Sequence, residues 1–213
     1  MIIIEAWAQG TGSILMHRAT EEGLGGGKPG RSNTMQSPED PRTVAGKAVY
    51  RMPDGKQLAV PGAAFARMLR EAGGAHKSKG SRKSVKFIVP AAVVVLDDLC
   101  GLYLHDRKTP VVDFEVDSRP VTIPATKGRV MRHRARSNEW CVCVTMQINE
   151  TILNEDVVRQ LFTEGGQQIG IGDFRPEKGG PFGTFGLVAW DHLEAAKPKT
   201  EAQKRNGGVA ARV

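Results

Sequence analysis

Trp140-Cys141-Val142-Cys143-Val144-Thr145-Met146-Gln147-Ile148-Asn149 is a stretch in which every second residue is large and apolar. This period of two is typical of a β-strand with one buried face. In the segment that follows, Asn154 can cap the start of a helix and Gly165 marks its expected end. The apolar positions between them share one helical face: Val157, Val158, Leu161 and Phe162. The stretch therefore predicts a half-buried strand over 140–149, followed by a helix over 154–165.

Four more elements are predicted around this pair. Residues 2–8 are apolar and β-branched, which favours a buried strand. Apolar residues between Phe65 and Ala72 recur at helical spacing and predict a short helix ending at Gly73-Gly74. The runs 87–96 and 185–190 predict two further strands. The order strand, helix, strand, insertion, strand, helix, strand is the βαββαβ order of an α+β, ferredoxin-like (RRM-like) domain with loop or hairpin insertions.

We expect one such domain over 1–190, with insertions at about 19–47 and 97–130. The first insertion has no periodicity and reads as a long surface loop, whereas the second contains a candidate hairpin around residues 106–110. The tail 191–213 is charged and lacks aromatic residues, a composition typical of disorder.

Composition excludes several classes of protein. The longest apolar run, 88–96, is too short for a membrane helix, and the N-terminus lacks the features of a secretory signal, so we expect a cytoplasmic protein. The three cysteines form no CxxC pair, and the five histidines have no metal-binding spacing, so no metal site is expected. The glycine-rich segment 165–186 matches neither a phosphate-binding Walker loop nor a dinucleotide fingerprint, so no cofactor is expected.

The positive charge is concentrated in two windows. The chain carries a formal net charge of +7, and the windows 72–96 and 118–138 contain eleven Lys and Arg residues and no acid, so the remainder is slightly acidic. Such a basic surface favours a polyanionic partner. Within the second window Arg132, Arg134 and Arg136 alternate, and on a strand they project from one face about 6.8 Å apart, a spacing suited to the phosphates of an extended single strand.

Simpler interpretations exist for both windows. An alternating basic edge also discourages aggregation between strands. The stretch Lys77-Ser78-Lys79-Gly80-Ser81-Arg82-Lys83 fits a mobile loop that orders on phosphates, and it equally fits a solubilising linker.

Three stretches carry recognisable motifs: Ser13-Ile14-Leu15-Met16-His17-Arg18 after the first strand, the helix start Val60-Pro61-Gly62-Ala63-Ala64-Phe65-Ala66-Arg67-Met68-Leu69-Arg70, and the glycine-rich segment 169–185. Together they resemble the RAMP superfamily of CRISPR-associated proteins, and most of all its guide-RNA-binding backbone subunits. The third is similar to a Gly-x-Gly-Asp-x-Arg-Pro…Gly-x-Phe-Gly-x-Phe loop. Ala63 and Ala64 replace the hydroxyl residues usual in the second stretch. The length also fits a compact phage or mobile-element relative.

The resemblance implies a subunit that binds single-stranded RNA, with single-stranded DNA as the other option, and that assembles head to tail with copies of itself or with other effector subunits, away from membranes. One of the two insertions would contact the RNA as a thumb. The residues expected to bind nucleic acid are Arg129, Arg132, Arg134, Arg136, Lys127, Lys77, Lys79, Arg82, Lys83, Arg70, Arg175 and Lys178.

Two alternatives remain open. An endoribonuclease of the same fold would use His17 as a general acid or base, although we expect His17 to have a structural or RNA-contact role and the protein not to be an enzyme. A phage structural protein would instead bind an acidic protein partner through the same basic patches.

Overall fold

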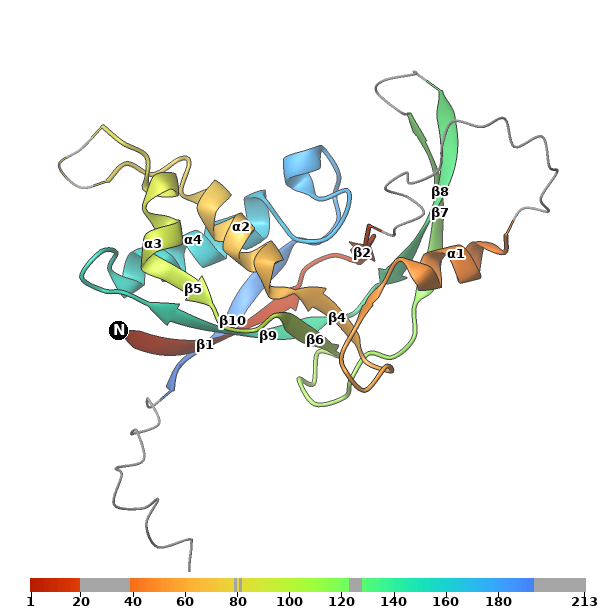
Figure 1. Cartoon of the computed structure of the whole chain (residues 1–213), viewed down its shortest axis with the longest axis horizontal. Coiled ribbons are helices and arrows are strands. Elements are labelled where there is room, and N and C mark those ends of the chain that lie inside the picture. Colours follow the sequence, from red (N-terminus) through yellow and green to blue (C-terminus); the bar gives the residue numbers. More distant parts are fainter. Residues whose placement is uncertain (20–38, 79, 81, 123–127, 194–213) are drawn as a thin grey trace, which may run out of the picture.

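The computed structural model describes residues 1–19, 39–78, 80, 82–122 and 128–193, which form two antiparallel sheets and several helices (Figure 1). In the main sheet the strands run in the order β10-β1-β9-β6-β4-β3, and β5 also pairs with β9. These strands are β1 (Ile2–Gly10), β3 (Tyr50–Arg51), β4 (Leu58–Pro61), β5 (Val93–Val95), β6 (Leu99–Tyr103), β9 (Cys141–Ile148) and β10 (Phe185–Leu193). The α+β class is confirmed.

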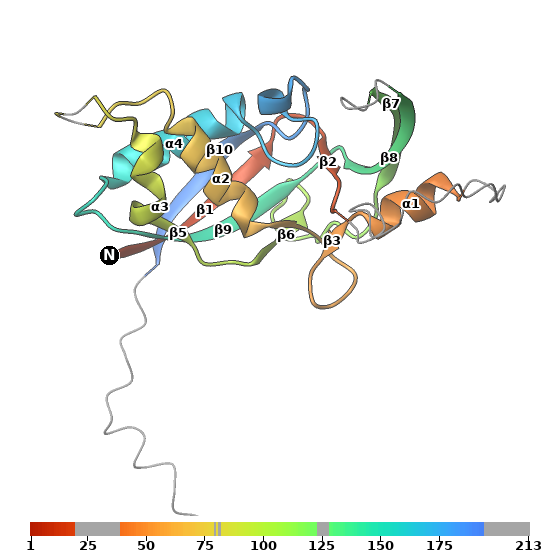
Figure 2. The ribbon, with the colours of Figure 1, turned by 45° about the horizontal axis from the view of Figure 1, so that its top comes forward.

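Helices cover one face of the main sheet, as Figures 1 and 2 show. They are α2 (Gly62–Ala72), α3 (Val89–Ala92) and α4 (Glu155–Gln168), with the short 3-10 turns η1 (Val85–Phe87) and η2 (Pro176–Lys178). Between α2, α4 and β10 lies an aromatic cluster in which Phe65 stacks on Phe162 at 6.0 Å between ring centroids and both rings contact Phe185. Burial of these rings ties the two helices to the sheet.

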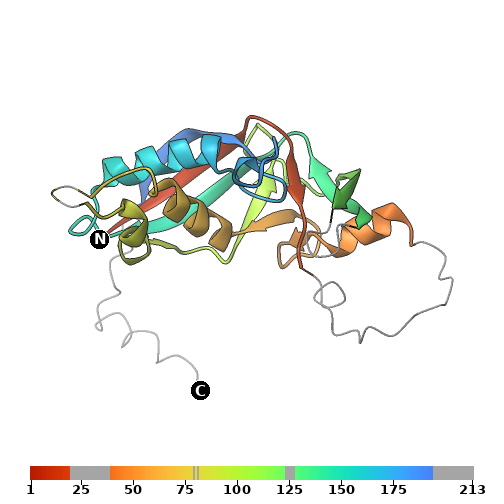
Figure 3. The ribbon, with the colours of Figure 1, turned by 90° about the horizontal axis from the view of Figure 1, so that it is seen from above.

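A second, three-stranded sheet lies at one end of the molecule. Its strands β2 (Ile14–Met16), β8 (Arg129–Ser137) and β7 (Glu115–Thr122) run in the order β2-β8-β7, and α1 (Pro41–Lys47) packs against β8 and β7. Seen from above in Figure 3, the β7–β8 hairpin and α1 lie at the end opposite the loop that joins α2 to η1. The two basic windows are therefore at opposite ends of the chain's long axis.

The strand through Trp140 and its helix agree with the prediction, with one difference at the helix end. Asn154 caps α4 by accepting a hydrogen bond from the backbone N–H of Asp156 at 2.7 Å. The helix continues past Gly165 to Gln168. A Cβ at Gly165 would come within 2.0 Å of the Met68 sulfur. This glycine therefore allows α4 to approach α2 closely and does not end the helix.

The prediction of a strand over 87–96 was largely wrong. Only 93–95 form a strand, β5, and the preceding residues form η1 and α3, with Pro90 in the first turn of α3. Proline is well tolerated in a first helical turn, because the N–H that it lacks has no partner inside the helix.

The predicted insertions also need correction. The segment 19–47 is not entirely loop, because it contains α1, while residues 20–38 lie outside the described residues. In 97–130, β6 belongs to the main sheet, where it pairs with β4 and β9. A turn does close near the expected place, since the N–H of Leu104 donates to the carbonyl of Thr109 at 2.8 Å. Of the tail, 191–193 complete β10 and 194–213 lie outside the described residues.

The cysteines are packed side chains. Cys100 and Cys141 are buried and Cys143 is half-buried. Burial raises the pKa of all three thiols, that of Cys100 to about 12. Among the described helices, none has the length and apolar character needed to cross a membrane.

Candidate nucleic-acid interface

The three stretches that resemble RAMP proteins meet at one cleft. Its cavity of about 350 Å³ is lined by the end of β2 with His17, by the first turns of α2 with Ala63 and Ala64, and by residues 169–177 of the glycine-rich segment. Segments more than a hundred residues apart in sequence thus form a single site. The end of β2 that lines the cleft belongs to a strand that pairs with β8 of the β7–β8 hairpin.

The glycine-rich segment is held in place by β2. The N–H of Asp173 donates to the carbonyl of Leu15 at 2.8 Å, and the N–H of Gly183 donates to that of Ser13 at 2.9 Å. Gly172 and Gly183 both have positive φ, and a Cβ at Gly183 would lie 1.7 Å from the Ile171 carbonyl oxygen. These glycines therefore serve contacts within the chain, and the side chains of the segment are left to line the cleft.

Arg132, Arg134 and Arg136 share one face of β8, as predicted, but have different surroundings. Arg132 is exposed and donates to the ring Nε2 of His17 at 2.8 Å. Arg136 is half-buried, and its Nε donates to the Ser13 hydroxyl at 3.2 Å. Arg134 is buried, with its Nε 2.6 Å from Asp173. Of the three, Arg132 is the guanidinium that is open to a ligand.

The surroundings of His17 keep its ring neutral. Partial burial and the neighbouring guanidinium of Arg132 lower the pKa of His17 below its ordinary value of 6.5. In this state Nε2 accepts the hydrogen bond from Arg132. Burial opposes ionisation of Asp173, but Arg134 and a backbone hydrogen bond outweigh it, so the pKa of Asp173 is lowered. The Asp173 carboxyl is therefore ionised at neutral pH beside the buried Arg134.

A second set of contacts ties the β7–β8 hairpin to the glycine-rich segment. Asp117 lies opposite Arg134 in the register of β7 and β8 and is buried. Arg119 donates to Asp117 at 2.9 Å and places its guanidinium 4.7 Å from the ring centroid of Phe182. Together with the ion pair between Arg134 and Asp173, these contacts fix the base of the hairpin relative to the cleft.

The remaining residues predicted on the hairpin are only partly described. Arg129 is exposed and lies on the face of β8 opposite to Arg132. Lys127 lies outside the described residues, as does Lys79 of the other basic window.

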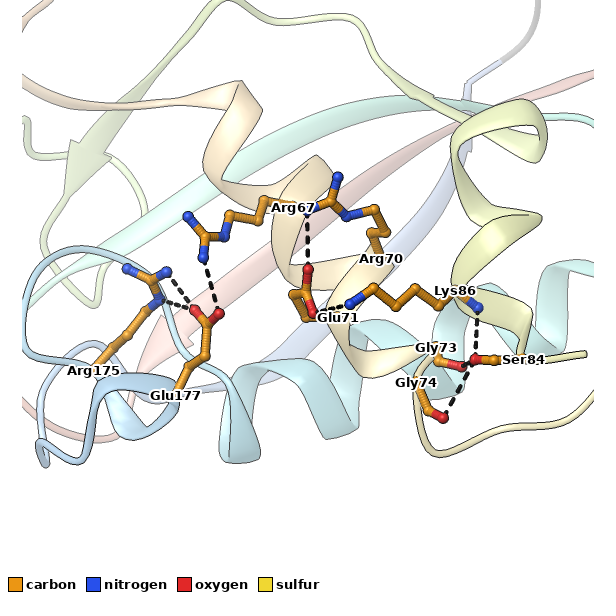
Figure 4. A network of polar contacts seen from close by, with 9 residues as sticks. All are labelled: Arg67, Arg70, Glu71, Gly73, Gly74, Ser84, Lys86, Arg175 and Glu177. Carbon is orange, nitrogen blue, oxygen red and sulfur yellow. Dashed lines mark hydrogen bonds and ion pairs between the residues drawn. The ribbon is translucent and has the colours of Figure 1, made fainter.

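Charged side chains along α2 belong to two groups, each held together by ion pairs (Figure 4). In one group Glu177 accepts from Arg67 at 2.9 Å and also pairs with Arg175. The second group joins Arg70 and Lys86 through Glu71, at 3.0 and 2.6 Å. Arg70 and Arg175 were predicted contacts, whereas Arg67 was missed, although it stands three residues before Arg70 within the same quoted stretch. Lys178 is exposed in η2.

The loop between α2 and η1 carries the other predicted lysines and arginines. Lys77, Arg82 and Lys83 are exposed in it, and His76 anchors its base to Glu164 of α4 at 2.6 Å. Figures 1 and 2 show this loop and the β7–β8 hairpin rising on the helix-covered side of the main sheet. The helix α2, which carries the charged groups and lines part of the cleft, lies between them. No group of three or more candidate metal ligands occurs among the described residues.

These features define an α+β protein with a helix-covered antiparallel sheet and a cleft bordered by a basic hairpin. No family model matches the sequence, and no curated protein matches it. Among solved structures, a chain of the Type III-B Cmr-beta structure bound to cognate target RNA is similar, with a TM-score of 0.51 and 11% identity over 92% of this chain and 61% of that chain.

Two further structures have lower TM-scores. Cmr6 from Pyrococcus furiosus matches at 0.43, with 10% identity over 88% of this chain and 98% of that one, and a chain of the Type IV-B CRISPR complex matches at 0.42, with 12% identity over 97% and 99%. The likeness to the Cmr-beta chain confirms the resemblance at the level of the fold. The chain spans 61% of the Cmr-beta chain that it matches.

Proposed function

We propose that this protein binds single-stranded RNA as a RAMP-type subunit of a CRISPR-type ribonucleoprotein. The observation that carries the proposal is the convergence of the three RAMP-like stretches on one cleft, with the exposed Arg132 donating a hydrogen bond to His17 of the lining. The RNA bound to the similar Cmr-beta structure is consistent with it.

The order of the helices and strands supports such a role. We infer that the βαββαβ unit consists, in chain order, of β1, α2, β5 together with β6 as the second strand, β9, α4 and β10. In the sheet its strands lie in the order β10-β1-β9-β6. The β7–β8 hairpin, together with α1, would be the insertion that contacts the RNA as a thumb. With this assignment, residues 1–190 form one domain.

Binding is expected to depend on phosphates. Arg132 on the hairpin, Arg67 and Arg70 on α2, and the exposed cations of the α2–η1 loop provide positive charge from one end of the helix-covered side to the other. Each phosphate neutralised on a single strand releases counterions, so affinity falls as salt rises. A single strand of RNA that lies along this side of the protein would cross the cleft.

The experiment is a fluorescence anisotropy titration with a short labelled oligouridine at several salt concentrations. Arg132→Ala should weaken binding and reduce the salt dependence, whereas Arg159→Ala, which removes an exposed arginine from α4 outside the cleft lining, should not. Equal affinity of both variants and wild type would refute the proposed interface. The same titration with oligothymidine separates RNA binding from binding of single-stranded DNA.

Assembly is a separate part of the proposal. A subunit of this type would associate head to tail with copies of itself or with other effector subunits. Sedimentation of the protein with and without long RNA tests this, because a backbone subunit forms larger particles with the RNA. A monomer under both conditions would contradict assembly while leaving RNA binding intact.

A cleaving role for His17 is the second candidate, and one observation favours it. His17 borders the cleft, and its lowered pKa makes the ring a base at neutral pH. Incubation of labelled RNA with wild-type protein and His17→Ala distinguishes the two functions. Products formed only by the wild type would establish cleavage, whereas a shifted band without products would support binding alone.

A further inference from the structure

The cleft has an apolar interior beneath its charged border. Its floor consists of Val60 and Met68 on the α2 side, Met16 at the end of β2, and Ile169 and Ile171 of the glycine-rich segment. Tyr50 of β3 adds an aromatic ring to the lining. Phosphates are strongly hydrated and gain nothing from such a surface. Contacts to phosphate therefore do not explain the interior.

The size of the cavity limits its occupant. At about 350 Å³ it lies near the lower end of the range of roughly 300–1,000 Å³ found for small-molecule sites. A planar group with apolar faces and a polar edge fits a cavity of this size and composition. The small side chains of Ala63 and Ala64 leave the α2 side of the cavity open.

The border of the cavity has the charge pattern of a nucleotide site. Arg67 and Arg175 lie on one side with Glu177 between them, and Arg132 contacts His17 on the other side. Asp173 is neutralised by Arg134, so the border keeps a net positive charge. Guanidinium groups suit phosphates at the mouth, and carboxylate oxygens accept hydrogen bonds from base N–H groups.

We propose that this cavity receives one unstacked nucleobase of the bound strand, while the adjacent phosphates lie at its arginine border. The inference rests on the proposed RNA binding and extends it, because a strand held only by its phosphates leaves the cavity unused. Base contacts of this kind tolerate any sequence, since every base presents an apolar face.

The test compares a short oligouridine with the same backbone made of abasic ribose units. Wild-type protein should bind the oligouridine roughly tenfold more tightly, a typical contribution of one base held on an apolar or aromatic surface. Ala64→Phe places a ring in the cavity and should remove this preference, so that this variant binds the two strands with equal affinity. Ala66→Phe is the matched control, because Ala66 lies on the same helix but lines a different groove, between α2 and β5. It should keep the preference.

Each result has a distinct meaning. Equal affinity of wild type for the two strands would overturn the base site and leave phosphate binding standing. A preference that survives in Ala64→Phe would place the base contact elsewhere and would also overturn this inference. Loss of binding to both strands by wild-type protein would refute the proposed RNA binding itself. A thermal melt of each variant reports whether it remains folded.

Discussion

Arg132 and Arg134 are two residues apart on the same face of β8, yet the structure predicts opposite consequences when each is replaced by methionine. Arg132 is exposed, whereas Arg134 is buried and paired with Asp173. Methionine keeps most of the apolar stem of arginine, so the comparison reports on the charged group. We expect Arg134→Met to reduce stability and Arg132→Met to reduce RNA affinity.

The magnitudes follow from burial. Removing one partner of a buried ion pair costs about 3–5 kcal/mol, but the Asp173 side chain is 34% exposed and can be hydrated once Arg134 is gone. We therefore expect Arg134→Met to lower the free energy of unfolding by about 2–3 kcal/mol, and the melting temperature by about 5–10 °C. Arg132→Met should change stability by less than about 0.5 kcal/mol.

Urea unfolding measures the first effect, and the salt dependence of RNA binding measures the second. Loss of one phosphate contact from a single strand lowers the slope of log affinity against log salt by about 0.7. We expect that decrease for Arg132→Met and an unchanged slope for Arg134→Met below its melting temperature. The reasoning fails if Arg134→Met is as stable as wild type, or if it alone changes the slope.

Three further outcomes are expected. The pKa of His17 in the folded protein lies below 6.5, so protonation of this ring favours the unfolded chain, and the stability of the protein should fall as the pH drops below 6.5. In thermal melts at a series of pH values, His17→Gln should show a smaller loss of stability over this range than wild type. Gly183→Ala should destabilise far more than Gly179→Ala in urea unfolding, because both residues have positive φ but only Gly183 faces a backbone oxygen, and equal losses would contradict this. Asn154→Ala should cost about 1 kcal/mol through loss of the α4 cap, and an unchanged urea midpoint would refute that role.

Sequence periodicity predicted those elements whose burial differs between their two faces. The strand β9 and the helix α4 have such patterns, and the structure confirms them. The run 87–96 is apolar throughout, and a run of that kind has no periodicity that separates a strand from a short helix. The prediction that Gly165 ends the helix was wrong. A glycine is needed there because Met68 of α2 lies close to it, and a contact between such distant segments cannot be recognised in the sequence.

The sequence predicted arginines at the candidate site, but it did not predict which of them are buried and which are exposed. Alternation on β8 correctly placed Arg132, Arg134 and Arg136 on one face. The burial of Arg134 depends on Asp173, which is 39 residues away in sequence and approaches only because the glycine-rich segment is bonded to β2. A pairing of this kind is not visible in a local pattern. The separation of the two basic windows along the molecule likewise depends on where β8 lies relative to α2.

The raised pKa values of the thiols have a practical consequence for labelling the β7–β8 hairpin. Thiol-specific dyes react with the thiolate, and the burial that raises the pKa of Cys100, Cys141 and Cys143 keeps that form scarce. A cysteine introduced at an exposed position such as Ser118 on β7 would then take up a maleimide fluorophore well ahead of the native ones. Distance changes between hairpin and labelled oligonucleotide would be measurable in the otherwise unaltered protein.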